Sequence, residues 1–134
     1  MKQFLMVVAL GLFLAATGCG GPRPTVGGTA GRLHSGSTNL SEIQVNVFRA
    51  EGTQFVPVGL GIPQPNGSFQ LVKLDASGPV TLEAGEYRCT LESIGATVTI
   101  PAELTKPETT KLKVNWLPSD SLLDLDVPPL KPTR

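Results

Sequence analysis

The sequence has little of several residue types from which functional sites are often built. Its 134 residues include two cysteines, one histidine and one tryptophan, and aromatic residues make up only 5%. Basic and acidic side chains balance at 11 each, so the chain lacks the excess of basic residues typical of nucleic-acid-binding proteins. No long segment has apolar side chains at a helical period. The sequence therefore argues against a nucleic-acid partner and against a helical fold.

The N-terminal residues have the pattern of an export signal. Lys2 precedes an apolar run from Phe4 to Ala16. This run is shorter than the roughly 20 residues that a membrane-spanning helix needs. We therefore interpret residues 1–18 as a secretory signal and exclude them from the prediction of the fold.

Small residues stand directly before the first cysteine, in the sequence AATGC of residues 15–19. This order resembles the bacterial lipobox, in which the signal is cut before a cysteine that has received a diacylglycerol. The resemblance implies that Cys19 is lipidated and that residues 19–25 form a short tether. It also implies an exported protein that is anchored to the cell envelope. The residue after Cys19 is Gly20 and not the aspartate that usually retains lipoproteins in the inner membrane, so the resemblance favours the outer membrane. The alternative is ordinary signal cleavage, which leaves Cys19 as a plain thiol.

The rest of the chain is predicted to form one all-β domain, residues 26–128. Glycine and proline are frequent, at 15 and 12 residues, as expected for a domain with many turns. Alternating apolar and polar side chains predict strands with one buried face. The predicted strands are 25–33, 42–52, 55–62, 68–74, 80–95, 111–117 and 122–128.

The alternation also predicts which side chains face the core. Phe48 breaks the pattern of its strand, which indicates a bulge or a second packed face. Tyr87 could bury its ring while its hydroxyl bonds a nearby backbone group, as in a tyrosine corner. The predicted inward residues are Ile43, Val45, Val47, Tyr87, Cys89, Leu91, Leu112, Val114, Trp116, Leu123, Leu125 and Val127.

The connections between strands have their own signals. Asn66-Gly67 predicts a tight hairpin between 55–62 and 68–74, because these residues accept positive φ values. Residues 98–110 are predicted to form an edge segment and loop, since Pro101 and Pro107 cannot donate to a sheet. We expect residues 129–134 to be a loosely held proline-rich tail.

The order of these segments resembles that of a known family. The similar stretches are VGGTAG, NGSFQL, GPVTLEAGEYRCTLES, IPAELTKPETTKLKVNW and LLDLDVP. They resemble small bacterial lipoproteins, common in planctomycetes, that carry a carboxypeptidase-regulatory-like, or transthyretin-like, domain. The resemblance implies a Greek-key, immunoglobulin-like β-sandwich of about seven strands, with no catalytic activity and no cofactor.

His34 and Cys89 are the two candidate catalytic groups. His34 is predicted to lie in the loop 34–41, and no G-x-S-x-G pattern accompanies it, so we interpret it as a loop histidine rather than a catalytic base. Cys89 is predicted to face inward, where a thiol packs as a small apolar group with a raised pKa. We therefore predict core packing for Cys89 and no enzymatic activity.

The sequence also contains a candidate calcium site and a candidate sugar-binding residue. Asp120, Asp124 and Asp126 could supply oxygen ligands to calcium, although outward carboxylates on a strand mostly keep it soluble. Trp116 is a possible ligand contact, because sugar rings stack on exposed aromatic side chains. Its alternation with Leu112 favours the core instead.

These observations predict a non-catalytic, lipid-anchored envelope protein that acts as a structural or interaction module. Its expected partners are the membrane, through acylated Cys19, and other envelope proteins or polysaccharide. The alternative is a module that binds envelope or extracellular polysaccharide. This module would bind through loops at one end of the sandwich or through an exposed Trp116, whereas the first hypothesis places Trp116 in the core.

Overall fold

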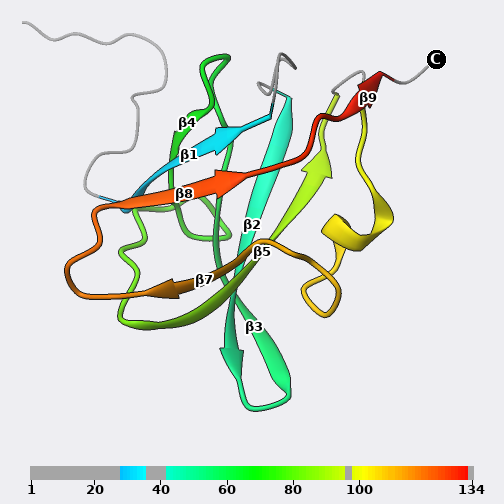
Figure 1. Ribbon diagram of the computed structural model, residues 1–134. Helices are drawn as coiled ribbons and strands as arrows, with labels where there is room; N and C mark the ends of the chain where they lie inside the picture. Colours follow the sequence, from blue (N-terminus) through cyan, green and yellow to red (C-terminus); the bar gives the residue numbers. More distant parts are fainter. Residues whose placement is uncertain (1–27, 36–41, 96–97, 133–134) are drawn as a thin grey trace, which may run out of the picture.

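The computed structural model describes residues 28–35, 42–95 and 98–132. Its regular structure is almost entirely β, with two main sheets on either side of one hydrophobic core (Figure 1). The prediction of an all-β fold is confirmed. The predicted signal, Cys19 and the tether lie outside the described residues, as does most of the predicted loop 34–41.

The larger sheet has four antiparallel strands in the order β3-β2-β5-β7. A two-residue turn, Gly52-Thr53, joins β2 to β3, and Gly52 has a positive φ of 64°. The pairing of β2 with β3 shifts register between Val47 and Phe48, which confirms the predicted bulge. The strands are β2 (Ile43–Glu51), β3 (Gln54–Gly61), β5 (Gly85–Ser93) and β7 (Lys113–Trp116).

The smaller sheet has three strands in the order β4-β1-β8. Here β1 runs antiparallel to β4 and parallel to β8. The strands are β1 (Ala30–His34), β4 (Ser68–Gln70) and β8 (Leu122–Asp126). A short pair, β6 (Val98–Thr99) with β9 (Lys131–Pro132), and one 3₁₀ helix, η1 (Ala102–Thr105), complete the described elements.

The core forms where the inward faces of the two sheets meet. The predicted inward residues are buried except Val114, which is half-buried against the core. The hydroxyl of Tyr87 donates to the backbone oxygen of Glu83 at 2.7 Å, so the predicted tyrosine-corner bond is present. Leu33, Phe69, Leu71, Leu82, Leu104 and Leu130 complete the buried apolar set.

The predicted hairpin around Gly67 forms only in part. Leu60 of β3 and Val72 make an antiparallel bridge, in which each amide donates to the other residue's backbone oxygen, at 3.0 and 2.9 Å. β3 pairs with β2, whereas β4 pairs with β1, so the chain passes from one sheet to the other. The turn itself exists: the Gly67 amide donates to the Gln64 oxygen at 2.7 Å, and Gly67 has a φ of 91°. The Gly67 oxygen also accepts the Leu33 amide at 2.8 Å. This bond holds the turn on β1, so the following residues join the smaller sheet.

The C-terminal segment is more ordered than predicted. Lys131 and Pro132 form β9, and Leu130 is buried with only 6% of its surface exposed. The expectation of a loose tail is therefore wrong for residues 130–132, because burial of Leu130 removes a large apolar side chain from water. The sequence also gave no signal for η1, which is too short to have a helical period.

Candidate functional site

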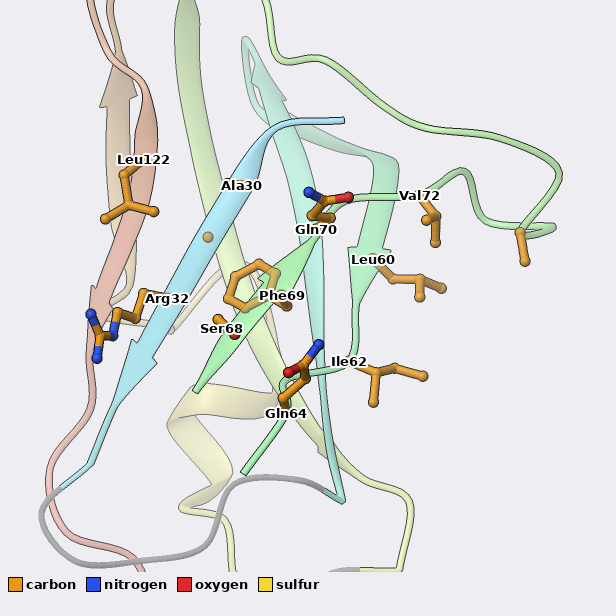
Figure 2. A pocket seen from close by; sticks show the side chains of 12 residues that line it. Ala30, Arg32, Leu60, Ile62, Gln64, Ser68, Phe69, Gln70, Val72 and Leu122 are labelled. Carbon is orange, nitrogen blue, oxygen red and sulfur yellow. The ribbon is translucent and has the colours of Figure 1, made fainter. Parts of the chain in front are cut away.

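An open groove lies beside the smaller sheet. Its volume is about 650 Å³. Strands β1 and β4 form its base, β8 lies on one side, and β3 with the segments around it lies on the other (Figure 2). The lining residues are Ala30, Gly31, Arg32, Leu60, Ile62, Gln64, Ser68, Phe69, Gln70, Val72, Ala76 and Leu122.

Phe69 forms the floor of the groove. Its ring is buried, with 5% of its surface exposed, and it packs against the backbone of β1 and β3 at two glycines, Gly31 and Gly61. A Cβ atom at either glycine would overlap the ring. The groove therefore depends on glycine at these positions, because any larger residue would displace Phe69.

The rim of the groove is mixed in character. Ile62 and Leu122 are large apolar residues with 48% and 45% of their surface exposed. Figure 2 shows Leu122 and Arg32 on one side of the Phe69 ring, with Leu60 and Ile62 on the other. Arg32 and glutamine side chains supply hydrogen-bond donors beside this apolar surface. Such a groove can bind a ligand or segment with both apolar and polar groups. No motif in the sequence predicts it, because its lining residues come from separate strands.

His34 lies at the end of β1 and not in a loop as predicted. Its Nε2 is 2.7 Å from Oδ1 of Asp124 on the neighbouring strand β8. Both side chains are about half exposed, at 47% and 61%. An exposed pair of this kind contributes at most about 1 kcal/mol. The hydroxyl of the next residue, Ser35, donates to the backbone oxygen of Pro128 at 3.1 Å. This hydroxyl therefore has a structural role.

The three aspartates considered as calcium ligands have separate roles. The carboxylate of Asp120 accepts the Leu117 amide at 2.7 Å and closes a turn, while Asp124 pairs with His34. Asp126 faces outward on β8, as predicted. Within the described residues, no group of three or more histidine, cysteine, aspartate or glutamate side chains is placed to hold a metal ion.

Trp116 lies in the core, with 6% of its surface exposed. The favoured prediction of a core residue is confirmed. The alternative, a ligand contact at Trp116, is contradicted, because a buried indole offers no face on which a sugar ring could stack. The reason is the inward alternation of Leu112, Val114 and Trp116, which places all three against the core. Burial of Trp116 removes one of the two surfaces proposed for a carbohydrate-binding module, and the loops at one end of the sandwich are the other.

Cys89 is fully buried at the centre of β5. Its burial raises the pKa of the thiol to about 12, because an ionised sulfur would lose its hydration. The thiolate is the reactive form of cysteine. The prediction that Cys89 packs in the core is confirmed, and the same burial disfavours the thiolate that a nucleophile would need.

Comparisons with known proteins found no match to the chain among family models, curated proteins or solved structures. In the described residues, no helix is both long enough and apolar enough to cross a membrane.

Proposed function

We propose that this protein is a non-catalytic, lipid-anchored module of the bacterial cell envelope, held in the outer membrane by an acylated Cys19. The observation that carries the proposal is the sequence AATGC at residues 15–19, which follows a signal-like apolar run. Gly28, the first described residue, follows Cys19 by nine positions in the sequence. Stable anchoring requires more than one acyl chain, and lipobox processing supplies two or more.

The groove is the surface that we propose for contact with other envelope components. It combines exposed Ile62 and Leu122 with donors such as Arg32. Protein contact surfaces combine apolar area with polar groups at their rim. A groove of this composition supports an interaction module more than a purely structural one.

We also propose that the domain is a Greek-key sandwich of the carboxypeptidase-regulatory-like type. Sheets of four and three strands support this, as does the Tyr87 hydroxyl bond to Glu83 four residues upstream. An experimental structure with a different strand order in either sheet would contradict this part of the proposal.

The anchor can be tested with two matched cysteine variants. The full chain, Cys19→Ser and Cys89→Ala are produced in a bacterial host, fed with a labelled fatty acid, and separated into membrane and soluble fractions. We expect label and membrane association in the full chain and in Cys89→Ala, and loss of both in Cys19→Ser. Equal fractionation of all three proteins, without label in any, would contradict the proposal.

A further inference from the structure

The groove beside the smaller sheet holds a single charged side chain. Arg32 is the only charged residue among the described residues that line the groove. Within the part of the chain that the structure describes, no ion pair or hydrogen bond joins its guanidinium to another residue. A guanidinium carries five N–H donors in a planar fork that matches the two oxygens of a carboxylate. The groove therefore presents a cation that is open to an anionic ligand.

A carboxylate on the neighbouring strand is engaged elsewhere. Asp124 of β8 is the register partner of Arg32. Its Oδ1 lies 2.7 Å from Nε2 of His34, which follows Arg32 by two positions on β1 and so points to the same face of the sheet. A ligand that binds Arg32 does not have to displace an internal ion pair, which would reduce its affinity.

The apolar surface of the groove extends to both sides of the Phe69 ring. Figure 2 shows Arg32 and Leu122 on one side of this ring and Leu60 and Ile62 on the other. A ligand that covered Leu122 and Ile62 would remove exposed apolar surface from water. The volume of about 650 Å³ lies within the range of roughly 300–1,000 Å³ that is typical of small-molecule sites. This arrangement fits an elongated apolar body with an anionic group at the Arg32 side.

The backbone of β4 argues against a peptide strand as the occupant. β4 bonds to β1 through alternate residues, which leaves the backbone groups of Ser68 and Gln70 on its free side. Those of Ser68 are occupied, because its amide donates to Oδ1 of Asn66 at 3.0 Å and its oxygen accepts the Gln64 amide at 2.8 Å. Val72, two residues beyond Gln70, is bridged to β3. A peptide could therefore pair with Gln70 alone, which is too short a ladder for strand addition.

The polar groups of the groove suit a carboxylate better than a sugar. Phe69 is the only aromatic residue among the described groove residues, and its ring is buried, so it offers little surface for stacking on a sugar. The side-chain amides of Gln64 and Gln70 add neutral N–H donors. One cation balances one negative charge, so a monoanion fits better than a phosphate ester, which carries up to about two charges at neutral pH.

We propose that the groove binds a free fatty acid, with its carboxylate at Arg32 and its chain along Phe69 toward Ile62. The inference rests on the proposed use of the groove as the contact surface of the domain, and it names the envelope component that this surface holds. Burial of the chain supplies the affinity, and Arg32 selects the anion. Binding is reversible and breaks no covalent bond, in keeping with a non-catalytic module.

Titration with two amphiphiles of equal chain length tests the role of charge. The chain 19–134 with Cys19→Ser keeps every described residue and has no acyl chain of its own. Decanoate and decyltrimethylammonium are added below their micelle concentrations, and amide NMR shifts give both the site and the dissociation constant. We expect decanoate to shift the amides of Arg32 and Gln70 and to leave that of Gly52, in the β2–β3 turn, unchanged. Decyltrimethylammonium should bind about tenfold more weakly or less.

Two pairs of variants separate the carboxylate from the chain. Arg32→Gln should weaken decanoate binding about tenfold, because it removes a charge-assisted hydrogen bond. Arg49→Gln is its matched control, since Arg49 is a strand arginine outside the groove with 37% of its side chain exposed. Ile62→Ser should weaken binding about threefold or more through lost apolar contact. Ile94→Ser, at a similar exposure of 46%, should leave it unchanged.

The outcomes decide between the possible occupants. Groove shifts that Arg32→Gln and Ile62→Ser weaken, and that the two controls leave unchanged, support the proposal. Equal binding of the two amphiphiles would overturn it, because the groove would then take any apolar chain. Absence of groove shifts with decanoate would also overturn it. If acetyl-trileucine then shifted the same amides, the groove would remain a contact surface, for peptides. The acylation of Cys19 is measured separately, by the labelled fatty acid in cells.

Discussion

The two sheets of this domain differ in length, packing and exposure. In the four-stranded sheet, β2 and β5 have nine residues each, and their inward side chains are almost completely buried. In the three-stranded sheet, the strands have five, three and five residues. One inward position there is Gly31, where the Phe69 ring of the neighbouring strand fills the space.

This difference indicates a division of roles within one small domain. Long paired strands bury apolar surface along their whole length and supply most of the stability. The shorter sheet contributes less to the core and forms the base of the groove. Residues on the exposed side of the smaller sheet can then be substituted with little change in the free energy of unfolding, because the residues that determine stability lie in the larger sheet.

The largest effect should come from the core of the larger sheet. Leu91→Ala removes a side chain that is 1% exposed, and we expect a loss of about 2–5 kcal/mol in the free energy of unfolding. Leu122→Ala, on the exposed side of the smaller sheet, should change it by about 0.5 kcal/mol or less. Urea denaturation measures both. Equal losses in the two variants would contradict the division between the sheets.

The groove floor should be sensitive to one added methyl group. In Gly31→Ala the new Cβ would overlap the Phe69 ring, and we expect a loss of about 1–3 kcal/mol in thermal or urea unfolding. Gly78→Ala is the control, because its Cβ would have no atom within 4 Å. Adding Phe69→Leu to Gly31→Ala should recover part of the loss. An unchanged stability in Gly31→Ala would show that the ring is loosely held.

Alkaline pH should destabilise the larger sheet through Cys89. Burial raises the pKa of this thiol from 9.0 to about 12, so above pH 9 the unfolded chain releases a proton that the folded protein retains. Stability therefore falls as pH rises, by roughly 1–1.5 kcal/mol between pH 8 and pH 10. Cys89→Ala should lack this part of the pH dependence. Identical pH profiles for the two proteins would contradict a buried thiol.

The smallest effect should come from the ion pair on the smaller sheet. Asp124→Asn removes the charge that faces His34 across 2.7 Å, but both side chains are well exposed. We expect a loss of about 0.5 kcal/mol or less at low salt, vanishing at high salt. A double-mutant cycle with His34→Ala would measure the coupling. A coupling much larger than 1 kcal/mol would mean that this pair organises the sheet.

Much of the local structure could be predicted from alternation alone. The inward faces that contain Val45, Cys89 and Leu125 follow from the two-residue period of a strand, which is a local property. The bulge at Phe48 could be predicted in the same way, because this residue interrupts the alternation. The burial of Trp116 could also be predicted, because this residue alternates with Leu112.

What the sequence did not predict depends on contacts between distant residues. The turn at Gly67 is predictable, but the partner of the next strand is not: β4 joins β1, where the Leu33 amide bonds the Gly67 oxygen, and Val72 then bridges back to Leu60 of β3. The groove arises where Phe69 lies over Gly31 and Gly61, three positions from different strands. Leu130 gave no periodic signal, because a single apolar residue among prolines becomes a core residue only when a cavity receives it.

The most direct test of the account is the mass of the mature N-terminal peptide from protein purified out of bacterial membranes. We expect a chain that begins at Cys19 and carries a diacylglycerol on the sulfur of that residue. A mature chain with a free Cys19 thiol, or one that begins at another residue, would contradict it.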